Sequence, residues 1–148
     1  MNPWDYSIIV VEDEASEVLL LKRAFQQAGL KNPLQVFRDG QEVIDYLSQR
    51  GVGVGGPATD APPGLMLLDL KMPRKTGFEV LEWLRHQPRL KRLVVVVMSN
   101  SLHLADISRA YELGCNSYLS KPANLDQFVE MARLINSYWL LLNVRPDL

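Results

Sequence analysis

The chain has 148 residues (16.8 kDa), 47% of them hydrophobic and 22% charged, so it has the size and composition of one globular domain and not of a disordered or fibrous protein. Its 16 Lys and Arg residues against 17 Asp and Glu residues give a net charge of −1, which predicts neither a nucleic-acid nor a membrane-surface partner. One cysteine, no apolar run of bilayer length and no signal-peptide pattern at the N-terminus favour a cytoplasmic protein without a disulfide.

Five short apolar runs alternate with amphipathic stretches along the chain. The apolar runs have the length of strands and comprise residues 7–11, 34–37, 65–68, 93–98 and 117–119. The amphipathic stretches have apolar residues at helical spacing and extend through residue 28, around 43–47, and over 76–84, 104–113 and 124–139. Thr76 and Glu79 match a helical capping box. Apolar strands joined by helices predict an α/β fold, with a parallel sheet covered by helices on both faces.

Residues 51–64 are rich in glycine and proline, which predicts a flexible surface loop before the third strand. The segment lacks the Lys-Ser or Lys-Thr ending of a phosphate-binding P-loop, so we expect no nucleotide site there. The predicted core covers about 6–136, and an apolar tail follows at 137–148. We therefore expect a single domain over residues 1–148, without an effector domain.

Polar side chains stand at the ends of four predicted strands. Glu12 and Asp13 follow the first, Asp69 the third, Ser99 the fourth and Lys121 the fifth. In an open parallel sheet, ligands bind beyond the carboxyl ends of the strands, so we expect these side chains to converge. Three carboxylates with one ammonium group repel one another unless a cation joins them, and a divalent ion would bring their formal charge to zero. A small set of oxygen ligands favours Mg²⁺ and leaves room for a phosphoryl group.

Most of these residues also have an ordinary structural explanation. Acids before a helix, such as 12–14, favour its dipole. Asp69 alone could form a turn or a cap, and Lys121 before a proline could be solvated. Their joint occurrence, one at each appropriate strand end, favours a site. The turn at 38–40, after the second strand, is interpreted as turn chemistry only.

Several segments resemble the receiver domains of two-component response regulators, from about residue 6 to 136. The matching segments are 9–14 (IVVEDE), 67–77 (LLDLKMPRKTG), 97–100 (VMSN), 114–118 (GCNSY) and 120–122 (SKP). The resemblance implies a flavodoxin-like (βα)5 fold, a doubly wound sheet of five parallel strands in the order 2-1-3-4-5. It also implies a signalling protein that catalyses only its own phosphotransfer and autodephosphorylation.

The family's roles transfer to matching positions of this sequence. Asp69 would accept a phosphoryl group from a phosphohistidine of a sensor histidine kinase. Glu12, Asp13, Asp69 and the backbone carbonyl of Lys71 would hold Mg²⁺. Lys121 would pair with Asp69 and then with a phosphoryl oxygen.

The resemblance also implies a switch. Ser99 would bind the phosphoryl group and Tyr118 would rotate inward, although Tyr118 could instead be a plain core or interface aromatic. Pro73 and Gly77 would shape the turn after the phosphoacceptor, and Pro122 would follow a cis bond that aims the preceding lysine.

Two positions depart from the common family pattern. Glu12 is longer than the aspartate often found there. Lys71 brings a cation where asparagine or methionine is frequent, and its alternative is a solvated lysine on a basic loop with Arg74 and Lys75. Cys115 is interpreted as a small buried hydrophobe.

The segment at 51–64 and the chain's ending resemble free-standing receivers that serve cyanobacterial and bacterial phytochrome kinases. We expect homodimerisation through the fourth helix, fifth strand and fifth helix together with an exposed apolar tail. Its candidate contacts are Tyr138, Trp139, Leu140, Leu141 and Leu142. The alternative is a tail folded back on its own domain.

Two other functions remain as alternatives. A haloacid-dehalogenase-type phosphatase would need a second aspartate as general acid two positions after Asp69, where this chain has Lys71. A receiver-like interaction module that does not use phosphate is the other alternative.

Overall fold

The computed structural model describes residues 2–51 and 61–146. The strands are β1 (Ser7–Val11), β2 (Leu34–Phe37), β3 (Pro63–Leu68), β4 (Val95–Ser99) and β5 (Ser117–Ser120). The helices are α1 (Ala15–Gln27), α2 (Gly40–Gly51), α3 (Gly77–Arg85), α4 (Leu104–Glu112) and α5 (Leu125–Ile135). A short helical turn, η1 (Pro3–Asp5), precedes β1, and a π-helical segment, η2 (Asn136–Leu142), follows α5.

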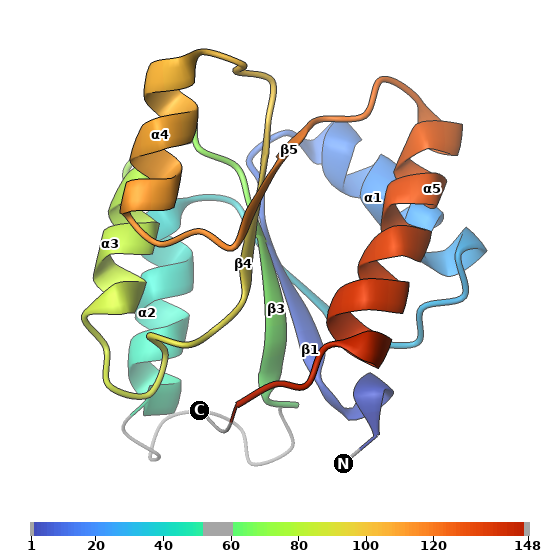
Figure 1. The fold of residues 1–148 in the computed structure, drawn as a ribbon, viewed down its shortest axis with the longest axis horizontal. Helices are drawn as coiled ribbons and strands as arrows, with labels where there is room; N and C mark the ends of the chain where they lie inside the picture. The colour runs from blue at the N-terminus through green and yellow to red at the C-terminus, as the bar shows by residue number, and fades with distance from the viewer. Residues whose placement is uncertain (1, 52–60, 147–148) are drawn as a thin grey trace.

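The five strands form one parallel sheet in the order β2-β1-β3-β4-β5. Figure 1 shows α2, α3 and α4 on one face of this sheet and α1 and α5 on the other. The α/β fold and the strand order predicted from the sequence are therefore confirmed.

The central strands are apolar because both of their faces are covered. Ile9 and Val11 lie in the core beneath α2, α3 and α4, whereas Ile8 and Val10 lie in the core beneath α1 and α5. All four side chains are buried. Successive residues of a strand point to opposite faces, so a strand between two helical layers needs no polar alternation. Burial of each such side chain contributes roughly 1.5–3 kcal/mol.

Some element boundaries differ from the prediction. Gly51 ends α2, and Pro63 and Gly64 begin β3, so both ends of the predicted 51–64 loop belong to regular elements. Positions 52–60 of that predicted loop lie outside the described residues. β4 begins at Val95, two residues later than predicted, and the Leu93 carbonyl accepts a hydrogen bond of 2.9 Å from Arg85 Nη1.

The C-terminal segment packs on its own domain. Leu140 is only 2% exposed and belongs to the core beneath α1 and α5. The Arg145 guanidinium lies 3.9 Å from the centre of the Tyr6 ring and also donates hydrogen bonds to the carbonyls of Trp139 and Leu140. The prediction that Leu140 contacts a second copy is therefore wrong for this conformation, because its side chain is already covered.

Other tail residues remain accessible. Trp139 is half-buried against the same core, whereas the exposed fractions of Tyr138, Leu141 and Leu142 are 54%, 55% and 73%. The tail thus contains both an inward-packed part and an exposed apolar part.

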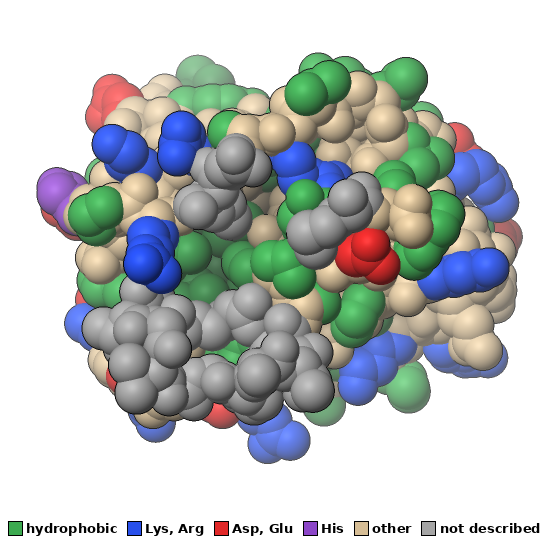
Figure 2. All heavy atoms as spheres, turned by 90° about the horizontal axis from the view of Figure 1, so that it is seen from below, with side chains coloured by type: hydrophobic (Ala, Val, Ile, Leu, Met, Phe, Trp, Pro, Cys, Tyr) green, Lys and Arg blue, Asp and Glu red, His purple; other side chains and the backbone are tan. Residues whose placement is uncertain are grey.

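Figure 2 shows the face at which the amino ends of the strands lie. Lys and Arg side chains are spread among hydrophobic ones there and do not gather into one stripe. In the described ranges, no helix combines the length and apolar character required to cross a membrane.

Candidate functional site

Three carboxyl groups meet at the carboxyl ends of β1 and β3. These strands are neighbours, Val11 lies opposite Leu68, and the Asp69 N–H donates a 3.1 Å hydrogen bond to the Val11 carbonyl. One carboxylate oxygen from each of Glu12, Asp13 and Asp69 lies within 4.8 Å of the others. Glu12 and Asp69 are buried, while Asp13 is exposed. Such a set of hard oxygen donors fits a divalent cation.

Lys121 lies against this cluster, but its main partners differ from those expected. Its Nζ is 2.7 Å from Glu12 Oε1 and 2.6 Å from Glu17 Oε2, whereas Asp69 Oδ2 is 3.6 Å away. Glu17 was not predicted as a site residue. It lies in the first turn of α1, where an acidic residue is normally explained by its favourable interaction with the helix dipole. Its position in the sequence therefore did not mark it as part of a site.

Burial and crowding set the charge of the carboxyl groups. Burial and the hydrogen bond with Glu17 together raise the pKa of Glu12 to about 9, against the opposing effect of Lys121. The same hydrogen bond lowers the pKa of Glu17. Burial raises the pKa of Asp69, against the opposing charge of Lys121. A bound cation would favour the ionised forms of these carboxyl groups, which is the chemistry that a metal site requires.

Lys121 itself stays charged. Burial alone would lower its pKa, but the hydrogen bonds to Glu12 and Glu17 and the charge of Asp69 outweigh that effect and raise it. Among the described residues there is no cis peptide bond, so the cis bond expected before Pro122 is not present. Lys121 is placed instead by the sheet, since its N–H donates a 3.0 Å hydrogen bond to the Ser99 carbonyl.

The loop after Asp69 is tightly closed. The Lys71 N–H lies 3.5 Å from Asp69 Oδ1, and the Gly77 N–H donates a 3.0 Å hydrogen bond to the Leu70 carbonyl. A Cβ at Gly77 would collide with the Asp69 carbonyl oxygen and lie 2.7 Å from Leu70 Cα. Glycine at this position is therefore what allows α3 to begin directly beside the acidic cluster.

The predicted switch residues meet at Ser101. Ser99 is buried, and its Oγ accepts a 3.0 Å hydrogen bond from the Ser101 N–H. The half-buried Tyr118 donates from its hydroxyl to the Ser101 carbonyl at 2.8 Å. Ser101 Oγ in turn donates to Asp106 Oδ2 on α4 at 2.6 Å. Ser101, absent from the predicted site, thus links both predicted switch residues to α4.

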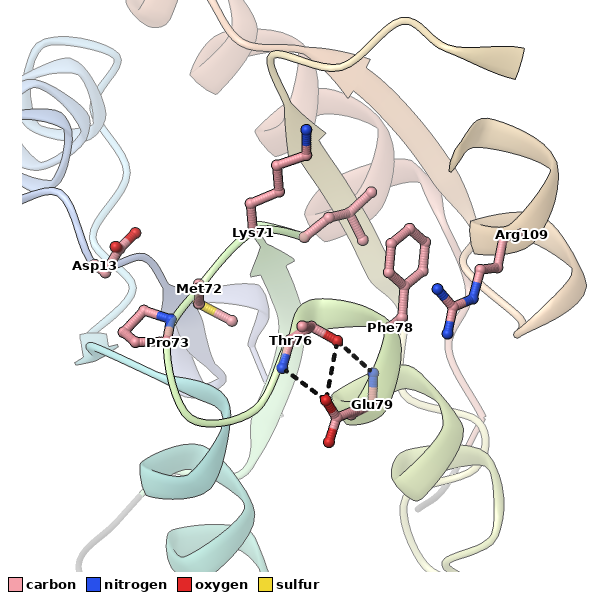
Figure 3. Close-up of a pocket in the computed structure, with 9 residues that line it drawn as sticks. Asp13, Lys71, Met72, Pro73, Thr76, Phe78, Glu79 and Arg109 are labelled. Carbon is pink, nitrogen blue, oxygen red and sulfur yellow. Dashed lines mark hydrogen bonds between the residues drawn. The ribbon is translucent and has the colours of Figure 1, made fainter. Parts of the chain in front are cut away.

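A hollow of about 620 Å³ adjoins the acidic cluster. Figure 3 shows Asp13 on one side of it, Phe78 and Arg109 on the other, and Lys71 between them. The Arg109 guanidinium lies 4.3 Å from the centre of the Phe78 ring. The same view shows the predicted capping box, in which Thr76 Oγ1 accepts from the Glu79 N–H and Glu79 Oε1 accepts from the Thr76 N–H.

Comparison with known proteins decides the family. Residues 8–133 match the model of the response regulator receiver domain. The chain belongs to the response regulator receiver domain family. It is 36% identical to the response regulator Rcp1 of Synechocystis sp. over 133 residues, which cover 90% of this chain and 88% of that protein.

Solved structures of receivers superpose closely on this receiver domain. The phosphorylated cyanobacterial phytochrome response regulator RcpA is 36% identical with a TM-score of 0.84, over 96% of this chain and 99% of that one. RPA3017, in red light signalling of R. palustris, is 33% identical with a TM-score of 0.86, over 97% and 99%. The Mn²⁺-bound form of Rcp1 is 34% identical with a TM-score of 0.81, over 96% and 99%.

Proposed function

We propose that this receiver domain accepts a phosphoryl group on Asp69 from the phosphohistidine of a sensor histidine kinase, in a reaction that requires Mg²⁺. The observation that carries the proposal is the meeting of Glu12, Asp13 and Asp69 within 4.8 Å of one another beside Lys121. A phosphorylation-dependent surface then transmits the signal to another protein.

In the proposed reaction, a carboxylate oxygen of Asp69 attacks the phosphorus atom. The phosphorus–nitrogen bond to the kinase imidazole breaks, and the imidazole leaves with the bonding electrons. The product is an acyl phosphate on Asp69. Lys121 Nζ, at 3.6 Å from the Asp69 carboxylate, is close enough to bind a phosphoryl oxygen, and Ser99 Oγ can donate a hydrogen bond to another.

Glu12, Asp13, Asp69 and the carbonyl of Lys71 would hold the Mg²⁺. When bound, the ion would supply positive charge beside the phosphoryl oxygens. The crowding of these three carboxyl groups and the Mn²⁺ described for Rcp1 both support a divalent cation here.

The kinase partner that we propose is of the phytochrome class. The support is the likeness to RcpA, described as a cyanobacterial phytochrome response regulator, and to RPA3017, described in red light signalling. The single cysteine, free and buried, fits a reducing compartment such as the cytoplasm.

A homodimer remains part of the proposal. The exposed side chains of Tyr138, Leu141 and Leu142 support it. A groove of about 470 Å³ between β5 and α5, lined in part by Leu119, Leu134 and Tyr138, supplies an apolar surface next to the tail.

Acetyl phosphate provides a test that needs no kinase. Wild-type protein incubated with acetyl phosphate and Mg²⁺ should gain one phosphoryl group in its intact mass, whereas Asp69→Asn or chelation of the metal should abolish the gain. An adduct that persists in Asp69→Asn would contradict the assignment. Absence of any adduct would favour the interaction module that does not use phosphate.

A further inference from the structure

The turn after β2, at residues 38–40, was predicted to serve only as a turn, but its side chains also contact other elements. Asp39 is buried, with 7% of its surface exposed. Its Oδ1 accepts a 2.9 Å hydrogen bond from the Glu42 N–H and so caps α2. Its Oδ2 lies 3.4 Å from Arg74 Nε in the loop that follows Asp69. The interpretation of 38–40 as a turn alone was therefore wrong.

Arg74 has an unusual backbone conformation. Its φ is +66°, and it is the one described non-glycine residue with a positive φ. A left-handed conformation at a non-glycine residue costs on the order of 1 kcal/mol and persists where its surroundings enforce it. The ion pair with Asp39 helps to hold Arg74 in this conformation.

Gly40 brings the same turn against the loop a second time. Its N–H donates a 3.2 Å hydrogen bond to the Lys75 carbonyl. A Cβ at this position would lie 2.8 Å from Lys75 Cβ and from Val80 Cγ2. The absence of a side chain at Gly40 thus allows the two turns to touch.

The loop from Leu70 to Gly77 is consequently fixed both at its base, where its two ends meet, and at its apex. At its base, the Gly77 N–H binds the Leu70 carbonyl and the Lys71 N–H approaches the Asp69 carboxylate. At its apex, the contacts come from Asp39 and Gly40. Lys71, whose carbonyl is one of the proposed cation ligands, lies between the base and the apex of this loop.

We propose that Asp39 is a positioning residue for the cation site, acting through its ion pair with Arg74 to fix the loop that carries the Lys71 carbonyl. This role rests on the proposed function. It gives the turn between β2 and α2 a part in cation affinity, although none of the residues of that turn is a proposed ligand. Groups that orient ligands of a metal site commonly change its affinity.

Two variants separate this role from simple stabilisation. Asp39→Asn keeps an oxygen that can cap α2 but removes the charge that pairs with Arg74. Arg74→Gly removes the cation and leaves a residue that adopts positive φ without strain. Arg133→Ala is a matched control, because it removes another ion pair, the 2.9 Å contact between Arg133 and Glu130 on α5. The side chains of Arg133 and Glu130 are 58% and 59% exposed, close to the 57% of Arg74.

Titration with Mn²⁺, followed by the EPR signal of the free ion, measures the cation affinity. Both test variants should bind Mn²⁺ about fivefold more weakly than wild type, and Arg133→Ala should bind like wild type. The rate of reaction with acetyl phosphate should return to that of wild type at saturating Mn²⁺, because the bound ion then orders the loop itself.

The outcomes distinguish this inference from the proposed function. Unchanged affinity in both variants, with normal binding by wild type, would overturn the positioning role alone. Failure of the wild type to bind Mn²⁺ would overturn the proposed function, and the positioning role with it. If Asp39→Asn does not fold, Arg74→Gly decides the question, since Arg74 is a solvent-exposed residue.

Discussion

Lys121 balances the negative charge at the sheet edge. Its ammonium group contacts Glu12 and Glu17 and approaches Asp69, and only 6% of its side chain is exposed. Replacing it with methionine should therefore lower the free energy of unfolding by roughly 3 kcal/mol. This value is at the low end of the range for breaking a buried ion pair, because Glu12 can take up a proton when the lysine is absent.

Urea denaturation at neutral pH measures this loss for Lys121→Met. The variant should recover part of its stability when Mg²⁺ is added, since the cation replaces the missing positive charge. A change of less than about 0.5 kcal/mol would mean that the lysine is not needed to hold these carboxyl groups together.

The buried thiol of Cys115 should react with alkylating reagents at a rate that depends strongly on pH. Burial raises the pKa of its thiol to about 11 from the usual 9.0, against the opposing charge of Arg85. Because the thiolate is the reactive form, alkylation by iodoacetamide at pH 8 should be about a hundredfold slower in the folded protein than in urea. The rate should rise about tenfold per pH unit up to pH 11. A folded protein that reacts as fast as the unfolded one would contradict the burial of this thiol.

The capping box of α3 makes a prediction about a single element. Thr76→Ala removes the side-chain oxygen that accepts from the Glu79 N–H, so it should cost about 1 kcal/mol of unfolding free energy. Thr76→Ser retains that oxygen and should restore most of the stability. Chemical denaturation compares the two variants, and equal losses would show that the methyl group and not the cap is responsible.

At the level of elements, short continuous apolar runs predicted the five strands and apolar residues at helical spacing predicted the five helices, because both patterns report on burial. The departures from the predicted boundaries have more than one cause. The Leu93 carbonyl is taken by Arg85, and the end of α5 passes into the π-helical η2, a change that no side-chain pattern encodes.

The acidic cluster was predictable because its members sit at strand ends. Glu17 and Asp39 were not, because each also occupies a place where helix capping or the helix dipole explains an acid. Only the three-dimensional approach of α1 to Lys121, and of the β2–α2 turn to Arg74, reveals their second contacts.

The tail bears on how the whole molecule assembles. Leu142 is exposed and Leu140 is buried, so substitution by alanine should affect different properties. Leu140→Ala should cost about 2–5 kcal/mol of stability without altering the fold. Tyr138→Ala combined with Leu142→Ala should leave stability nearly unchanged and shift any dimer toward monomer in sedimentation velocity. Equal monomeric mass for the wild type and the double variant would refute the proposed dimer.

Asp69 is the proposed phosphoacceptor of this receiver domain. Borohydride reduces an acyl phosphate to an alcohol, so it converts a phosphorylated aspartate to homoserine. After incubation with acetyl phosphate and Mg²⁺, borohydride treatment followed by peptide mass spectrometry should find homoserine at position 69 and nowhere else, and none when Mg²⁺ is omitted. Homoserine at position 13, or a stable phosphoryl group on Ser99, would contradict the assignment of Asp69 as the phosphoacceptor.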